Sequence, residues 1–173
     1  MAQNLPDWLT LYAVPGLGPA IFPSLVQQFR TPSEVLRARP ERLAKVPYVG
    51  MEIARAILES KDSTWSLDQI SRAEDGEVRI LTILDPDYPL NLKQIYTPTP
   101  ALYVRGEIGL CSQLTVAIVG SRSFTSYGKD SAYRMAGELA SRGITVVSGM
   151  ATGIDTYAHR GALSVEGYTA AVL

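Results

Sequence analysis

The sequence is most constrained by an alternation of short apolar runs and amphipathic stretches that begins near residue 115. Residues 116–119, 144–147 and 169–173 are short, largely apolar runs. The two stretches between them carry apolar residues at helical spacing, and each ends at a glycine, Gly143 or Gly167. Short continuous apolar runs are typical of strands buried on both faces of a parallel sheet. The order strand, helix, strand, helix, strand therefore predicts a doubly wound, Rossmann-like α/β sheet.

The first sixty residues predict a domain of short helices with a weak internal repeat. Residues 14–21 align with residues 46–53, and each copy places a proline, an aliphatic residue and a glycine before a helix. This turn resembles the helix-hairpin-helix module, whose free backbone N–H groups can hold a DNA phosphate. Gly16 and Gly18 are the candidate phosphate contacts, but Tyr48 stands in the second copy where the first has Gly16. Because few basic residues flank the turns, a packing or protein-contact role is the favoured interpretation.

The residues between the helices and the sheet form a connector with two strand candidates. Residues 78–84 and 101–105 are rich in β-branched and apolar residues, and a proline-rich link precedes the second of them. We therefore predict three parts: a helical domain over 1–62, a connector with lead-in strands over 63–114, and an incomplete Rossmann-like domain over 115–173.

Composition excludes several classes of protein. The chain has 16 basic and 17 acidic side chains and a net charge of −1, so any contact with nucleic acid depends on a few well-placed groups. One cysteine, Cys111, allows no internal disulfide, and a single histidine, His159, makes a zinc site unexpected. No apolar run is long enough to span a membrane, and the N-terminus lacks the features of a signal peptide. We expect a cytoplasmic protein without a metal.

Two loops follow the first two strands of the predicted sheet, residues 120–128 and residues 148–155. Because the carboxyl ends of parallel strands lie at one edge, we expect both loops to open into one crevice. Each loop leads into a helix N-terminus, which favours an anion, and Arg122 supplies a planar charged fork for a phosphate. Glycines let the backbone approach a ligand closely, and hydroxyl groups donate hydrogen bonds. The predicted contact residues are Gly120, Ser121, Arg122, Ser123, Phe124, Tyr127, Ser148, Gly149, Ala151 and Gly153.

Some of these residues also have a purely structural interpretation. Phe124 and Tyr127 could stack on bases or simply cover the loop. Asp155 and His159 lie one helical turn apart and could act as an acid–base pair. A carboxylate in a first turn also stabilises the helix dipole, and a lone histidine is more often a packing residue, so both are secondary candidates. Arg122 is the strongest candidate, because a charge in a glycine-rich loop has little packing role.

Two familiar nucleotide-binding motifs are absent. No Gly-x-Gly-x-x-Gly follows the first strand, and there is no Walker A sequence. We therefore expect neither a dinucleotide cofactor nor NTP hydrolysis, and no other cofactor is indicated.

Several motifs resemble the DprA/Smf family of DNA-processing proteins in order and spacing. The N-terminal helices resemble the SAM-like or helix-hairpin-helix domain of that family, and residues 80–89 and 100–106 resemble the lead-in to its Rossmann-like domain. The core motifs are Val119-Gly120-Ser121-Arg122, Tyr127-Gly128, the run from Gly143 to Asp155, Ala158-His159 and Gly161-Ala162-Leu163.

The resemblance implies a non-enzymatic protein that binds incoming single-stranded DNA during natural transformation, protects it and loads the RecA recombinase. It also implies that Arg122 lines the DNA pocket and that the protein forms homodimers. Members of the family continue with further strands and pocket residues, so we expect this protein to continue past Leu173. The alternative hypothesis is a nucleotide-processing enzyme of the lysine-decarboxylase-like group, a nucleoside monophosphate phosphoribohydrolase, with Asp155 and His159 as the acid–base pair. The Pro-Gly-Gly motif typical of that group is absent.

Overall fold

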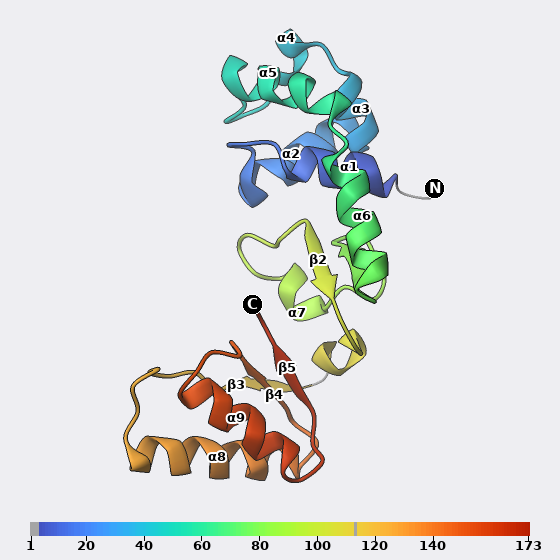
Figure 1. The fold of residues 1–173 in the computed structure, drawn as a ribbon. Helices are drawn as coiled ribbons and strands as arrows, with labels where there is room; N and C mark the ends of the chain where they lie inside the picture. The colour runs from blue at the N-terminus through green and yellow to red at the C-terminus, as the bar shows by residue number, and fades with distance from the viewer. Residues whose placement is uncertain (1–3, 113) are drawn as a thin grey trace. The chain divides into compact units, whose positions relative to one another are not determined.

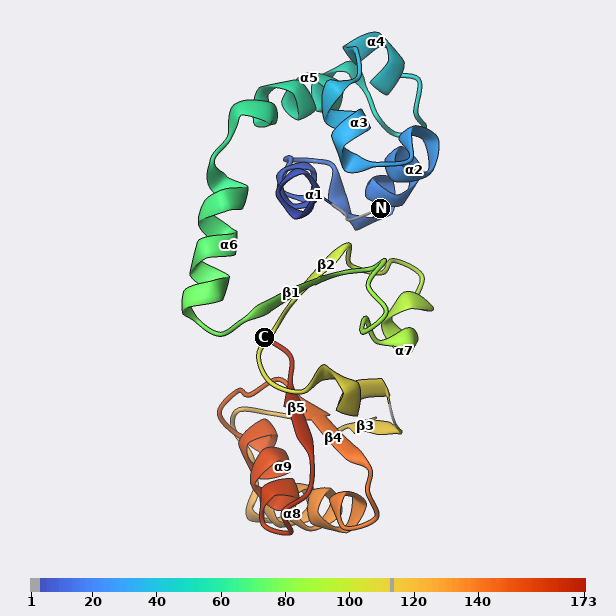
Figure 2. The ribbon, with the colours of Figure 1, turned by 90° about the vertical axis from the view of Figure 1, so that its right-hand side faces the viewer.

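The computed structural model of the protein describes residues 4–112 and 114–173. The chain divides into two compact units, Met1–Gly106 and Glu107–Leu173. Figure 1 and Figure 2 show the path of the chain and the elements of each unit from two sides. Each unit has its own apolar core, so the two are described separately.

The first unit opens with short helices around one apolar core. Trp8 and Phe22 lie at the centre of this core, with their ring centroids 4.9 Å apart. The indole N–H of Trp8 donates to the carbonyl of Pro100 (3.0 Å), which ties the strands of this unit to its helices. The elements are α1 (Leu5–Tyr12), α2 (Gly18–Phe29), α3 (Pro32–Arg37), α4 (Pro40–Leu43), α5 (Met51–Glu59), a 3₁₀ turn η1 (Ser60–Asp62) and α6 (Trp65–Asp75).

The internal repeat of the first unit is visible in the backbone. Gly16 and Tyr48 occupy equivalent positions, and both have positive φ, 79° and 66°. The turns diverge two residues later, where Gly18 has φ 54° and Gly50 has φ −76°. The predicted hairpin turns are therefore similar but not identical, and the second forces a tyrosine into a conformation that favours glycine.

Two strands complete the first unit. They are β1 (Arg79–Thr82) and β2 (Ala101–Val104), which pair antiparallel so that Arg79 lies opposite Val104. A short helix, α7 (Leu90–Lys93), lies in the connection, and the buried Tyr88 anchors this connection by donating to the carbonyl of Thr99 (2.9 Å). Both predicted strands are confirmed, but the sequence did not predict α7.

The second unit is a three-stranded parallel sheet with two helices. The strand order is β3-β4-β5, with Ala117 opposite Val147 and Val147 opposite Ala170. Figure 1 and Figure 2 show α8 and α9 on the same face of the sheet, as expected for two right-handed crossovers that advance in one direction. The elements are a 3₁₀ turn η2 (Ile108–Ser112), β3 (Thr115–Ala117), α8 (Ser126–Ala140), β4 (Thr145–Ser148), α9 (Ile154–Leu163) and β5 (Thr169–Ala171).

The predicted parallel α/β sheet is confirmed, but one detail differs. A doubly wound sheet carries helices on both faces, whereas the described residues place helices on one face only. On the other face, the carbonyl of Leu110 in η2 accepts a hydrogen bond from the Thr145 hydroxyl (3.2 Å). The second helical layer that the sequence pattern predicts is not part of the described residues.

Small residues let α8 and α9 approach each other closely. A Cβ on Gly161 would lie 2.9 Å from the carbonyl carbon of Tyr133 and 3.0 Å from the Cβ of Ala136. A Cβ on Gly137 would lie 3.3 Å from the carbonyl oxygen of Gly161. The core beneath the helices is built from Ala136, Ala140, Val146, Ala158 and Ala162. This close crossing fixes the relative positions of the two helix N-termini, where the candidate loops lie.

In the part of the chain that the structure describes, no helix combines the length and the apolar character needed to cross a bilayer.

Candidate functional site

The two loops that follow β3 and β4 touch each other, as the sequence predicts. The N–H of Ile154 donates to the carbonyl of Ser121 across the two loops (3.2 Å). Gly153 has φ 100° and packs against the first loop so tightly that a Cβ on it would lie 2.6 Å from the Cα of Arg122. The carboxyl ends of the two neighbouring parallel strands therefore meet at one edge of the sheet, where the sequence predicts the crevice.

Two more glycines make this contact possible. A Cβ on Gly120 would lie 2.8 Å from the Cβ of Ile154, and a Cβ on Gly149 would lie 2.8 Å from Oδ2 of Asp155. At distances below 3.0 Å a neighbouring atom must shift to admit a side chain, either Ile154 beside Gly120 or the Asp155 carboxylate beside Gly149. Glycine at these positions therefore fits the observed packing of the loops.

Arg122 is the charged group of this crevice. Its side chain is exposed, and within the described residues it forms no ion pair. Its backbone is held by Gly153 on one side, so the guanidinium projects from a fixed position. An exposed, unpaired guanidinium on a rigid loop is free to bind an external phosphate or carboxylate.

Several predicted hydrogen-bond donors already have internal partners. The Ser148 hydroxyl is buried and donates to the carbonyl of Ile118 (2.7 Å). The Ser123 N–H donates to the Ser121 hydroxyl oxygen (3.1 Å). The Ser148 hydroxyl therefore joins the ends of β3 and β4, and a contact between Ser148 and a ligand stays a prediction.

The second loop is held from inside by Asp155. This side chain is only 6% exposed, and its Oδ2 accepts the N–H of Gly149 (3.2 Å). The carbonyl of Ala151 accepts the hydroxyl hydrogen of Thr156 (2.9 Å). These contacts fix the loop shape, and they also remove the Gly149 N–H from the set of donors available to a ligand.

The helix N-termini behind the loops are partly capped. At α8 the N–H of Gly128 donates to the Thr125 hydroxyl oxygen (3.1 Å), and at α9 the N–H of Ile154 is bound by Ser121. An anion in the crevice would therefore depend on Arg122 and on the remaining first-turn N–H groups.

The two predicted stacking residues differ in their surroundings. Phe124 packs edge-on against Tyr157, with ring centroids 5.1 Å apart and an interplanar angle of 69°. Tyr127 is 82% exposed on the first turn of α8. Phe124 therefore covers part of the protein while it leaves 41% of its surface exposed, and Tyr127 has an open ring face.

His159 is engaged in packing the sheet against α9. The Thr169 hydroxyl donates to the carbonyl of Val146 (2.8 Å), so it accepts the hydrogen of Nδ1 of His159 (2.7 Å). Burial lowers the pKa of His159, and the nearby Asp155 carboxylate opposes that shift only in part. The histidine and Asp155 thus each have a structural partner, and neither contact joins them as an acid–base pair.

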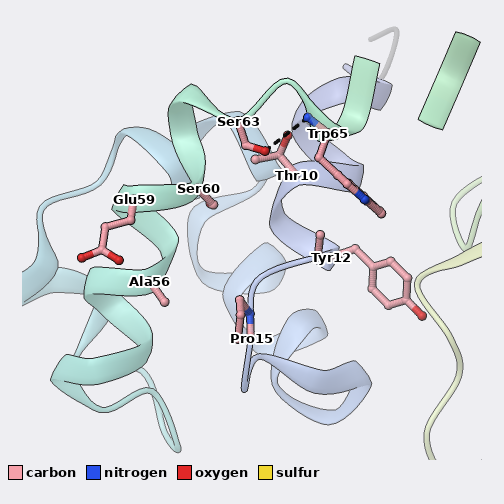
Figure 3. Close-up of a pocket in the computed structure, with 9 residues that line it drawn as sticks. Thr10, Tyr12, Pro15, Ala56, Glu59, Ser60, Ser63 and Trp65 are labelled. Atoms are coloured by element: carbon pink, nitrogen blue, oxygen red, sulfur yellow. Dashed lines mark hydrogen bonds between the residues drawn. The ribbon is translucent and has the colours of Figure 1, made fainter. Parts of the chain in front are cut away.

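The first unit offers a groove of a different character. It has a volume of about 760 Å³ and lies between α1, α5 and the start of α6 (Figure 3). At its edge, the Trp65 N–H donates to the Ser63 hydroxyl oxygen (3.2 Å). Glu59 is the charged residue among those that line it, and the lining includes no lysine or arginine. This groove therefore does not suit a phosphate.

A second groove of the first unit is basic. It has a volume of about 380 Å³ and is lined by three arginines, Arg30, Arg37 and Arg42, and by Glu34. The guanidinium of Arg42 lies 5.3 Å from the centre of the Phe29 ring. The candidate hairpin contacts Gly16 and Gly18 do not line either groove.

Sequence reasoning missed three residues beside the crevice. Tyr157, on α9, has the Lys129 ammonium 5.3 Å and the Arg160 guanidinium 5.9 Å from its ring centre. The spacing of Tyr157 and Arg160 on one helix could have indicated their contact. The contact with Lys129 depends on how α8 crosses α9, which no local pattern shows.

Together, the fold and the loop geometry define a class of protein: a Rossmann-like α/β protein whose first two strand-end loops meet at one edge of the sheet, preceded by a hairpin-repeat helical unit. Comparison with known proteins agrees. Residues 79–173 match the family model described as DNA recombination-mediator protein A, and residues 9–60 match that of a SAM-like helix-hairpin-helix tandem. The chain belongs to the DprA/Smf family.

Individual relatives support this assignment. The chain is 34% identical to Protein Smf of Synechocystis sp. over 170 residues, which is 96% of this chain and 43% of that protein. It is 39% identical to the DNA processing protein DprA of Streptococcus pneumoniae over 92 residues, 53% of this chain and 32% of that protein. The chain therefore spans less than half the length of these relatives.

A solved structure shows the same fold. The X-ray structure of DprA from Streptococcus pneumoniae superposes with a TM-score of 0.74 at 24% identity, over 98% of this chain and 58% of the other. The predicted combination of a SAM-like helical region and a Rossmann-like sheet is thereby confirmed.

Proposed function

We propose that the protein binds single-stranded DNA in the crevice between its two strand-end loops. The single observation that carries this proposal is Arg122, an exposed guanidinium without an ion-pair partner in the described residues, held where Gly153 fixes its backbone. Membership of a recombination-mediator family makes a DNA strand the expected anion.

The chemistry of the crevice favours a single strand over a duplex. A guanidinium and backbone N–H groups bind phosphates without reading sequence, and the open ring of Tyr127 can stack on an unpaired base. Bases in a duplex are already stacked on each other and are not available to an aromatic side chain. Since the net charge is −1, affinity must arise from these few contacts and not from a broad basic surface.

Membership of the family suggests a biological role, which is the second part of the proposal. The protein would protect incoming single-stranded DNA during natural transformation, in the cytoplasm, and load the RecA recombinase onto it as a homodimer. This role is a binding role and requires no catalytic residue. It is tested by adding the complete protein to RecA and single-stranded DNA coated with a single-strand-binding protein, and by measuring the rate of RecA filament formation.

DNA binding itself is tested with an Arg122→Ala variant of the complete protein. We expect weaker binding to labelled oligo-dT and to mixed sequences alike, and a salt dependence that is shallower by about 0.7 in log–log slope, as for one lost phosphate contact. Arg142→Ala, which removes an exposed arginine just beyond the other end of α8, is the matched control and should bind normally. Equal binding by the Arg122→Ala and Arg142→Ala variants would overturn the proposal.

A further inference from the structure

We propose that the bound DNA strand leaves the crevice across α8 and α9, over a second contact surface. This surface, the Tyr157 cluster, consists of Phe124, Lys129, Tyr157 and Arg160. The inference rests on the proposed function and extends it, because it assigns a path and additional residues to the same ligand.

The cluster is built around one aromatic ring. The edge-on contact between Phe124 and Tyr157 (5.1 Å between centroids) joins the first loop to α9. Lys129 Nζ lies 5.3 Å and Arg160 Cζ lies 5.9 Å from the centre of the Tyr157 ring. Contacts from a loop and from two helices thus converge on one side chain, Tyr157.

No ion pair within the described residues neutralises the cations of the cluster. Within the described residues neither Lys129 nor Arg160 forms an ion pair. Of the acidic side chains on the two helices, Glu138 pairs with Arg134 and Asp155 accepts the N–H of Gly149. Asp130 also forms no ion pair in the described part of the chain. An aromatic ring attracts a nearby cation but leaves its charge in place, so two positive charges remain to attract an external anion.

The combination of groups fits a nucleotide strand better than an acidic peptide. Cations beside partly exposed aromatic rings are the usual elements of a surface that binds single-stranded nucleic acid, because phosphates meet the charges and bases meet the rings. Phe124 keeps 41% of its surface exposed beside Tyr157. An acidic peptide would satisfy the charges but would leave these aromatic surfaces without a partner.

The cluster is also continuous with the crevice. Phe124 follows Arg122 by two residues in the same loop, and Tyr157 lies in the first turns of α9, directly behind Gly153. A strand with one phosphate at Arg122 therefore meets the cluster with its neighbouring nucleotides. The crevice alone would hold a short oligonucleotide, and the cluster would add affinity only for a longer one.

The test compares oligonucleotides of two lengths with charge-removing variants of the complete protein. Lys129→Gln and Arg160→Gln, singly and combined, are measured against a short thymidine dinucleotide and against oligo-dT of about 20 nucleotides. For the double variant we expect binding of the long oligonucleotide to weaken about tenfold, with a salt slope shallower by about 1.4, and binding of the short one to change little. The Lys129→Arg variant should bind the long oligonucleotide as the wild type does, because it keeps the positive charge.

The controls separate this inference from the proposed function. Arg122→Ala should weaken binding of both lengths, and Arg142→Gln should weaken neither. If Arg122→Ala weakens binding but the Lys129→Gln/Arg160→Gln double variant binds both lengths normally, the cluster is no DNA contact and the proposed function stands. If Arg122→Ala also binds normally, the proposed function fails as well. If the double variant loses binding to an acidic peptide but not to the long oligonucleotide, the cluster is a protein contact and the inference is overturned.

Discussion

Gly153 and Arg122 pack backbone against backbone, so that a Cβ on Gly153 would lie 2.6 Å from the Cα of Arg122. This contact joins the loop after β3 to the loop after β4, and it sets the position from which the Arg122 guanidinium projects. The conformation of Gly153, with φ 100°, is one that L-residues with a side chain rarely adopt. Space and backbone geometry therefore both demand glycine at this position.

We predict that Gly153→Ala lowers both the stability of the second unit and its affinity for DNA. The added methyl group forces the two loops apart, and overpacking of this kind costs about 1–3 kcal/mol of unfolding free energy. Because Arg122 moves with its loop, oligo-dT binding should weaken at least as much as in Arg122→Ala. Denaturant unfolding and fluorescence anisotropy measure the two effects.

Gly109→Ala is the matched control for this substitution. Gly109 lies in the same unit, and a Cβ on it would meet nothing within 4 Å. This variant should keep wild-type stability and binding. A Gly153→Ala protein as stable as Gly109→Ala would show that the loops do not need the close contact.

Two substitutions at Asp155 test whether its carboxylate has a structural role or a catalytic one. We expect Asp155→Ala to destabilise the second unit by about 1–3 kcal/mol, because it leaves the part-buried Gly149 N–H without its acceptor. Asp155→Asn keeps an acceptor oxygen in place and should recover most of that loss. Chemical denaturation of the three proteins measures the difference. If the asparagine variant were as unstable as the alanine variant, the carboxylate charge and not the hydrogen bond would hold the loop.

His159 should make the stability of the second unit sensitive to acid. Burial lowers the pKa of His159 in the folded protein below its ordinary value of 6.5. The unfolded chain therefore takes up a proton at a higher pH than the folded chain does, and the free energy of unfolding falls as the pH drops below about 6.5. Above about pH 6.5, His159 is neutral in both the folded and the unfolded chain, and its full contribution to the free energy of unfolding is present.

The measurement is hydrogen exchange in α9 and β5 between about pH 5 and pH 8, corrected for the intrinsic exchange rate. His159→Asn retains a donor for the Thr169 hydroxyl and has no titrating ring, so its stability should change less across this range. Identical pH profiles for the two proteins would refute the assignment of the acid sensitivity to His159.

Tyr48 offers a stabilising substitution in the first unit. It has φ 66° and is 88% exposed, so its side chain contributes little packing while its backbone is strained. Tyr48→Gly should raise the free energy of unfolding by up to about 1 kcal/mol, since the strain of about 1–2 kcal/mol exceeds the entropy cost of glycine.

Tyr96→Gly is the corresponding control. Tyr96 is fully exposed, and its backbone does not lie in the left-handed region. A glycine at this position only makes the unfolded chain more flexible, so Tyr96→Gly should lower the free energy of unfolding or leave it unchanged. Hydrogen exchange of the amides of α2 and α5 reports both variants, and a loss of stability in Tyr48→Gly would show that the turn needs its tyrosine.

Local sequence patterns predicted the elements but not all of their limits. The first strand of the parallel sheet was expected at residues 116–119 and is found as β3 at Thr115–Ala117, because the chain turns into the loop once Ile118 has made its last hydrogen bond with β4. The local sequence Thr31-Pro32-Ser33-Glu34 has the form of a capping box, and Thr31 caps α3 by accepting the Glu34 N–H (3.2 Å). The division of the chain at residues 62 and 114 stays a prediction.

The candidate site was predicted in outline only. Glycines, Arg122 and strand ends are visible in the sequence, so the meeting of the two loops could be expected. The internal hydrogen bond of the Ser148 hydroxyl could not be expected, because its acceptor, the carbonyl of Ile118, lies 30 residues away in the chain. Whether these residues contact DNA stays a prediction.

The order of helices and strands could be predicted from local patterns, since periodicity and turn residues act over a few neighbouring positions. The same patterns show which loops carry glycine and charge. Which groups remain free for a ligand depends on the folded arrangement: Arg122 stays unpaired in the described residues, while Ser148, Asp155 and His159 have internal partners. Hydrogen bonds and cation–ring contacts between distant residues depend on how two helices cross, and a local sequence pattern does not contain that information.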